Sequence, residues 1–137
     1  MVFGSVNWIA VIVAMVASMA LGFVWYMALA KQWMGALGKT REQVMSSSGG
    51  QATPFIIAAL IQLVMAYSLA LFIPRIMGAT TITNGLIVAF HVWLGFVITS
   101  MIINHRYQGS KWSLTLIDGG YLLGVLLVQG LVIGLFG

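Results

Sequence analysis

Four long apolar runs, separated by short polar connections, dominate the pattern of this chain. Each run approaches or exceeds the roughly 20 residues that an α-helix needs to cross a bilayer core about 30 Å thick. Residues 1–137 are therefore expected to form a single all-α transmembrane domain, an integral membrane bundle of four helices. The helices are predicted at about residues 6–30, 54–73, 83–104 and 113–136.

Polar signals mark two boundaries inside this pattern. Thr40 and Gln43 have the spacing of a capping box, which predicts a short amphipathic helix in the first connection, ending near Gly49 and Gly50. Pro74 follows the second apolar run, and proline interrupts helix hydrogen bonding. We therefore expect the second helix to end at Ile73.

Composition and charge place these helices in a membrane. Hydrophobic residues make up 61% of the chain and charged residues 6%, against about 25% charged residues in soluble domains. The second connection holds Arg75, and the first and third hold the other basic residues. By the positive-inside rule, the termini are expected on the non-cytoplasmic side of a bacterial inner (plasma) membrane. The basic residues of the first and third connections are Lys31, Lys39, Arg41, Arg106 and Lys111.

Small residues recur at helical spacing on the first and fourth helices, where they predict close helix packing. The fourth helix also carries polar residues on the side opposite its glycines, so both of its faces need neighbours. It is expected to lie centrally in the bundle or to contact a second copy of the chain. The packing candidates are Ala14, Ser18, Gly22, Gly120, Gly124 and Gly134, and the polar face carries Asp118, Tyr121 and Gln129.

Asp118 is the strongest candidate for chemistry, because a carboxyl group inside a membrane is costly and usually faces a bundle interior. Helical rise places it about 9 Å into the core, at a depth shared by candidate partners on other helices. A neutral, hydrogen-bonded Asp118 could bind a proton or cation in a transport path, or it could be a structural clasp. Its candidate partners are Tyr121, Tyr26, Trp25 and Gln62.

The third helix adds His91 and Asn84 as candidates for transport or ligand binding. His91 lies about 9 Å further from the cytoplasmic side by helical rise, within reach of a water chain. It could equally be a neutral packing residue. With two histidines, no cysteine and no ligand motif, the sequence predicts no metal site and no cofactor.

One tetrapeptide, LGFV, occurs at Leu21–Val24 and again at Leu94–Val97, on the first and third predicted helices. This repeated motif could mark a duplicated helical hairpin, as in transporters built from parallel repeats. It could also be coincidence in a chain of few residue types. Both interpretations stay open.

Several motifs resemble a known family. They are NWIAVIVA at Asn7–Ala14, LGFVWY at Leu21–Tyr26, WLGFV at Trp93–Val97 and LIDGGYLL at Leu116–Leu123. Together they resemble the uncharacterised bacterial membrane family called domain of unknown function 1761. The resemblance implies a four-helix membrane protein without an assigned activity, and it supports interest in Trp25, Tyr26, Asp118 and Tyr121.

The sequence therefore favours a small multi-pass membrane protein, expected to be homo-oligomeric, that conducts a proton, a cation or a small solute by means of Asp118. The alternative is a non-catalytic accessory or scaffold protein whose glycine faces bind another membrane protein. An intramembrane enzyme acting on lipid is the least favoured hypothesis, because no catalytic motif accompanies the serines. The expected partners are the lipid bilayer and further membrane proteins, with no nucleic acid.

Overall fold

The computed structural model describes residues 2–47 and 52–137. Every regular element in these ranges is helical, as predicted. The helices are the short η1 (Val2–Ser5), α1 (Trp8–Ala28), α2 (Ala30–Leu37), α3 (Arg41–Ser47), α4 (Ala52–Met77), α5 (Ile82–Val92), the π-helical η2 (Trp93–Val97), α6 (Ile98–Tyr107) and α7 (Trp112–Phe136).

Four helices among the described residues are long and apolar enough to cross a membrane, in agreement with the predicted number of helices. They are α1, α4, the continuous segment Ile82–Tyr107 and α7. The prediction that the second helix ends before Pro74 is wrong, because α4 contains Pro74 and continues to Met77. The missing N–H removes only one hydrogen bond near the helix end, and Gly78 N donates to Pro74 O at 2.8 Å to close the last turn.

The first connection forms two short helices. Leu29 interrupts the first run, so α1 ends at Ala28 and α2 begins at Ala30. The predicted capping box opens α3: Gln43 Oε1 accepts from Thr40 N at 2.9 Å, and Thr40 Oγ1 accepts from Gln43 N at 3.2 Å. The predicted end of this helix at Gly49 and Gly50 lies outside the described residues.

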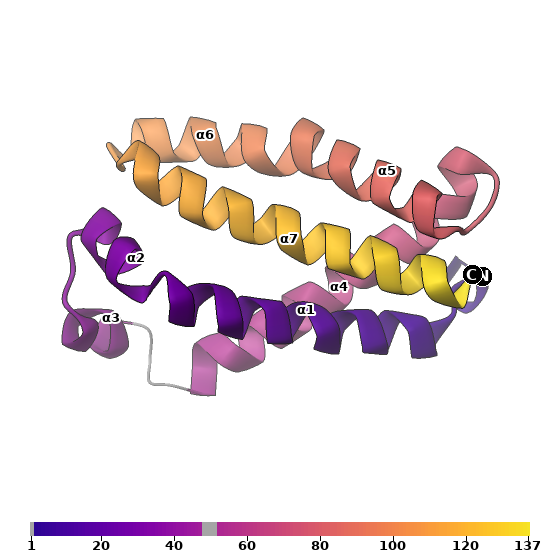
Figure 1. Cartoon of the computed structure of the whole chain (residues 1–137), viewed down its shortest axis with the longest axis horizontal. Helices are drawn as coiled ribbons and strands as arrows, with labels where there is room; N and C mark the ends of the chain where they lie inside the picture. The colour runs from indigo at the N-terminus through magenta and orange to yellow at the C-terminus, as the bar shows by residue number, and fades with distance from the viewer. Residues whose placement is uncertain (1, 48–51) are drawn as a thin grey trace.

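Helix α7 lies at the centre of the bundle and contacts α1, α4, α5 and α6. In Figure 1 it runs between α1 and the α5–α6 segment, while α4 crosses behind. Both chain termini lie at one end of the bundle, which we call the terminal end. The opposite end, which carries α2, α3 and the α6–α7 turn, is the basic end. Of the two arrangements expected for the fourth helix, the structure has the central position.

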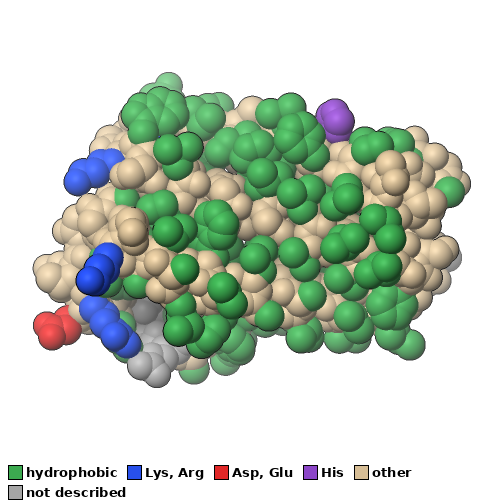
Figure 2. All heavy atoms as spheres, viewed as in Figure 1, with side chains coloured by type: hydrophobic (Ala, Val, Ile, Leu, Met, Phe, Trp, Pro, Cys, Tyr) green, Lys and Arg blue, Asp and Glu red, His purple; other side chains and the backbone are tan. Residues whose placement is uncertain are grey.

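The surface of the bundle is apolar along its length. Figure 2 shows hydrophobic side chains distributed over the flanks, while the lysine and arginine side chains seen from this side gather at the basic end. Large residues such as Phe23, Phe55 and Phe96 are more than 60% exposed. Such a surface is consistent with a membrane protein, because apolar side chains can remain in contact with lipid.

The interior is closed by small residues at helix crossings. A Cβ atom added to Gly85 would overlap Gly130 O, so the backbones of α5 and α7 touch there. Gly120 packs on Trp25 and Gly124 on Leu21, both in α1. Gly134 instead packs on α5, beside Ile82. The glycines of α7 therefore serve contacts within this chain.

Candidate functional site

The carboxyl group of Asp118 is paired with a phenol. Tyr26, near the end of α1, donates its hydroxyl hydrogen to Asp118 Oδ1 at 2.5 Å. Both side chains are partly buried, and Trp33 of α2 packs edge-on against the Tyr26 ring with centroids 5.3 Å apart. Among the described residues, no lysine or arginine forms an ion pair with Asp118. The structure therefore selects Tyr26 from the four predicted partners.

A second polar cluster joins three helices deeper in the bundle. Gln62 of α4 donates from Nε2 to the Tyr121 hydroxyl at 2.5 Å and accepts from Ser18 Oγ at 2.6 Å. Gln129 donates from Nε2 to Ser18 Oγ at 3.0 Å and to the backbone oxygen of Gln62 at 2.9 Å. Ser18, Gln62 and Gln129 are buried, at 0%, 4% and 0% exposure. We call Tyr121, Gln62, Ser18 and Gln129 the inner cluster.

An aromatic contact joins the Asp118–Tyr26 pair to the inner cluster. The rings of Tyr26 and Tyr121 meet edge to face, with centroids 4.9 Å apart. From Asp118 to Gln129, polar side chains extend about 16 Å along α7, given the rise per residue of an α-helix. Three of the four partners predicted for Asp118 thus lie in one continuous region, and of these three Tyr26 bonds to the acid itself.

The fourth predicted partner, Trp25, binds the backbone beside Asp118. Its indole Nε1 donates to Ile117 O at 3.1 Å, and Trp93 Nε1 donates to Gly119 O at 2.8 Å from the opposite side of α7. Trp93 begins the π-helical turn η2, and such turns are frequent at functional sites. Two tryptophans from different spans therefore hold the backbone carbonyls that flank Asp118. Trp93 was not selected from the sequence, although it begins the WLGFV motif.

His91 and Asn84 are not part of this region. His91 is exposed, and its Nδ1 lies 2.8 Å from Ile87 O of its own helix. Asn84 donates from Nδ2 to Ala79 O at 3.0 Å and so closes the turn before α5 at the terminal end. The two candidates on the third span therefore lie apart from Asp118 and from the inner cluster.

A further polar group that sequence reasoning missed lies at the start of α7. Thr115, which is 2% exposed, meets His105 Nδ1 at 2.7 Å and accepts from Arg106 Nη2 at 2.9 Å. The Arg106 guanidinium also stacks on the Trp112 ring, 3.7 Å from its centroid. These contacts fix the α6–α7 turn one helical turn before Asp118. Within the described ranges, no three histidine, aspartate or glutamate side chains are placed to share a metal ion.

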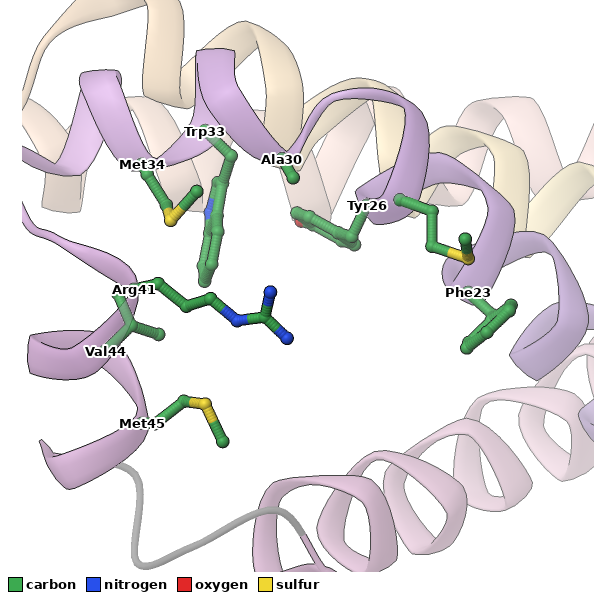
Figure 3. Close-up of a pocket in the computed structure, with 9 residues that line it drawn as sticks. Phe23, Tyr26, Ala30, Trp33, Met34, Arg41, Val44 and Met45 are labelled. Atoms are coloured by element: carbon green, nitrogen blue, oxygen red, sulfur yellow. The ribbon is translucent and has the colours of Figure 1, made fainter.

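A cavity of about 560 Å³ lies beside the Asp118–Tyr26 pair at the basic end. Figure 3 shows its walls, in which α1 and α2 lie across from α3, and the Arg41 side chain extends from α3 across the opening. The Tyr26 ring forms part of the wall, so the cavity reaches the phenol that binds Asp118. The remaining lining residues are Phe23, Met27, Ala30, Trp33, Met34, Val44 and Met45.

Comparison with known families gives one match. The family described as protein of unknown function (DUF1761) matches residues 9–134, and the chain belongs to this family. The resemblance drawn from the sequence motifs is thereby confirmed. Comparison with curated proteins gives no match. Comparison with solved structures gives none either.

Proposed function

We propose that the protein is a small membrane transporter that moves a proton, or a cation in its place, by way of Asp118. The observation that carries this proposal is the position of the Asp118 carboxyl group. It lies between a cavity at the basic end and a chain of polar side chains that continues into the bundle. An acid is costly within a membrane, and such residues commonly mark ion and proton pathways.

The chain's own groups provide the steps that a proton needs at this end. Tyr26 and Trp33 line the cavity, and the Tyr26 hydroxyl donates to the carboxyl group that would hold the proton. Beyond the ring of Tyr121, the amide of Gln62 and the hydroxyl of Ser18 form the inward continuation. Hydroxyl groups both donate and accept hydrogen bonds, so Tyr26 and Ser18 can each exchange a proton with a neighbour. Between them, the ring contact of Tyr26 with Tyr121 and the Gln62 amide require a bridging water molecule to continue the path.

The other half of the bundle interior holds a smaller cavity, of about 220 Å³ at the terminal end, lined in part by Asn7, Pro74 and Ile133. The core between the inner cluster and the terminal end also contains buried aliphatic side chains, including Val11, Leu69 and Ile73, each at most 1% exposed. Among the described residues, these side chains separate the Asp118 carboxyl group from the cavity at the terminal end in this conformation. Transport requires a second arrangement in which these side chains separate, as in alternating access.

A scaffold function, with Asp118 as a structural clasp, is the second candidate. It is supported by the inner cluster, which ties α1, α4 and α7 together through buried hydrogen bonds. Its second element, glycine faces that bind partner helices, has less support, because Gly120, Gly124 and Gly134 pack within this chain. The same variant tests both functions.

Proton flux into liposomes separates the two functions. Purified protein is reconstituted into liposomes that contain a pH-sensitive dye, and a pH gradient is imposed with potassium and valinomycin to balance charge. We expect flux above that of protein-free liposomes, and an Asp118→Asn variant should fall to the protein-free rate. Glu42→Gln is the matched control, since it removes an exposed acid of α3 and should leave the flux unchanged.

Specific outcomes of the liposome assay would refute the transport proposal. If the folded wild-type protein carries neither protons nor sodium or potassium ions, or if folded Asp118→Asn carries them at the wild-type rate, Asp118 is not the transport group. If Asp118→Asn unfolds at lower temperature in detergent while flux is absent throughout, the clasp explains the residue. Circular dichroism of each variant establishes that it is folded.

The proposal includes the setting of the protein. We place it in the inner membrane as a non-enzymatic, homo-oligomeric protein surrounded by lipid, with the basic end in the cytoplasm and both termini outside. The asymmetry of the basic residues supports this orientation. Exposed apolar side chains on α1, such as Ile9, Val16 and Phe23, are available to a second copy. Native mass spectrometry of the detergent-solubilised protein measures the number of copies.

A further inference from the structure

The cavity at the basic end has the chemistry of a lipid site, and we infer that it binds the headgroup and upper acyl chain of an anionic phospholipid. This inference does not depend on transport through Asp118. It follows from the lining of the cavity, from one charged side chain that extends into it, and from the order of these groups along the bundle.

The lining is suited to hydrocarbon. Apart from Arg41, the cavity is lined by aliphatic, aromatic and methionine side chains, including Phe23, Met27 and Met34. Phe23 and Met27 are 68% and 66% exposed, so the cavity continues onto the lipid-facing surface of α1. Methionine is flexible and adapts to irregular apolar shapes. The volume of about 560 Å³ lies within the range of about 300–1,000 Å³ that is typical of ligand sites.

The positive charge of Arg41 in the cavity favours binding of an anion. Figure 3 shows the Arg41 side chain extending from α3 into the space below Trp33 and Tyr26. Among the described residues, the Arg41 guanidinium makes no hydrogen bond or ion pair. A guanidinium group binds phosphate through two parallel hydrogen bonds. Lys31 and Lys39 are exposed in the same connection and add positive charge at this end.

The cavity residues are also arranged like the parts of a lipid in a leaflet, with the charged residue near the membrane surface and the apolar residues deeper. Arg41 belongs to α3, outside the spans at the basic end, whereas Phe23 lies more than a helical turn inside α1. A phosphate at Arg41 would therefore direct an acyl chain past Met27 towards Phe23 and the hydrocarbon core. Basic pockets on the cytoplasmic side of membrane proteins bind anionic headgroups in this way.

Native mass spectrometry can measure this binding directly. Detergent-solubilised protein is mixed with either phosphatidylglycerol or phosphatidylcholine carrying the same acyl chains, and the retained lipid is counted. We expect preferential retention of phosphatidylglycerol. An Arg41→Gln variant should lose about tenfold in affinity, because a charged hydrogen bond is removed. Lys39→Gln is the matched control: it removes the same charge two residues away, from a side chain that does not line the cavity.

A cavity-filling variant tests the position of the site. Ala30 lines the cavity at the first residue of α2, and Ala30→Phe should prevent retention of phosphatidylglycerol although Arg41 remains. Three results would overturn the inference: equal retention of the two lipids, equal loss in Arg41→Gln and Lys39→Gln, or full retention in folded Ala30→Phe. The second of these results would indicate diffuse surface charge in place of a site.

Discussion

Replacing Gln62 with leucine tests how much the inner cluster stabilises the bundle. The side chain of Gln62 is 4% exposed and makes two hydrogen bonds, to Ser18 and Tyr121. Leucine has a similar size, so the change removes these bonds without opening a large cavity. Ser18 keeps a second acceptor, Met15 O at 2.9 Å, and Gln129 keeps the backbone oxygen of residue 62. The loss is therefore limited to the two side-chain bonds.

The magnitude follows from hydrogen bonds measured inside membranes. These average about 0.6 kcal/mol and reach about 1.7 kcal/mol, so Gln62→Leu should lower the free energy of unfolding by about 1–2 kcal/mol. The assay is reversible unfolding by SDS in mixed micelles, followed by far-UV circular dichroism. Ser68→Ala is the control, because that hydroxyl bonds only to Val64 O of its own helix. Its effect should stay within about 0.5 kcal/mol.

Two outcomes would refute this reasoning about Gln62. A Gln62→Leu protein as stable as Ser68→Ala would show that the inner cluster contributes nothing beyond local bonding. A loss above about 4 kcal/mol would show that the side chain does more than its two bonds explain. An intermediate loss supports the inner cluster as the element that ties α1, α4 and α7 together.

Two further predictions concern packing and orientation. Gly130→Ala should lower stability by about 1–3 kcal/mol, because its Cβ would overlap the backbone oxygen of Gly85. Gly95→Ala, with nothing within 4 Å of its Cβ, should not, and equal SDS unfolding curves would refute the close α5–α7 contact. The chain has no cysteine, so Ser5→Cys and Gln108→Cys give clean labelling sites in intact cells. An impermeant maleimide should label the first and spare the second, and the reverse pattern would overturn the orientation.

Much of the architecture could be predicted because hydrophobic length is a local property of the chain. The four spans and the capping box of α3 depend on runs and spacings that a sequence displays directly. The end of α4 could not be predicted in this way, because a proline near a helix terminus costs little once packing holds the last turn. The neighbours of Gly134 could not be predicted either. A helical projection shows which residues share a face of one helix, but it does not show which other helix packs against that face.

The candidate site was also predicted only in part from the sequence. Sequence reasoning identified Asp118 and a set of partners at matching depth, because depth follows from helical rise. It could not choose Tyr26 over Tyr121, since that choice depends on the rotation of α1 and α7 about their axes. It also missed the role of Trp93, whose bond to Gly119 O is made from a π-helical turn that widens the local backbone. No periodicity in the sequence specifies that turn.

The two polar groups of the bundle differ in a way that bears on function. The inner cluster already connects α1, α4 and α7 through uncharged amides and hydroxyls, of which Ser18, Gln62 and Gln129 are at most 4% exposed, where a clasp is most effective. The Asp118–Tyr26 bond connects α1 and α7 a second time, with an acid that is costly in a membrane. An asparagine would serve such a clasp at lower cost. The carboxyl group instead bonds to Tyr26, whose ring lines a cavity, and this position favours the transport proposal over the clasp.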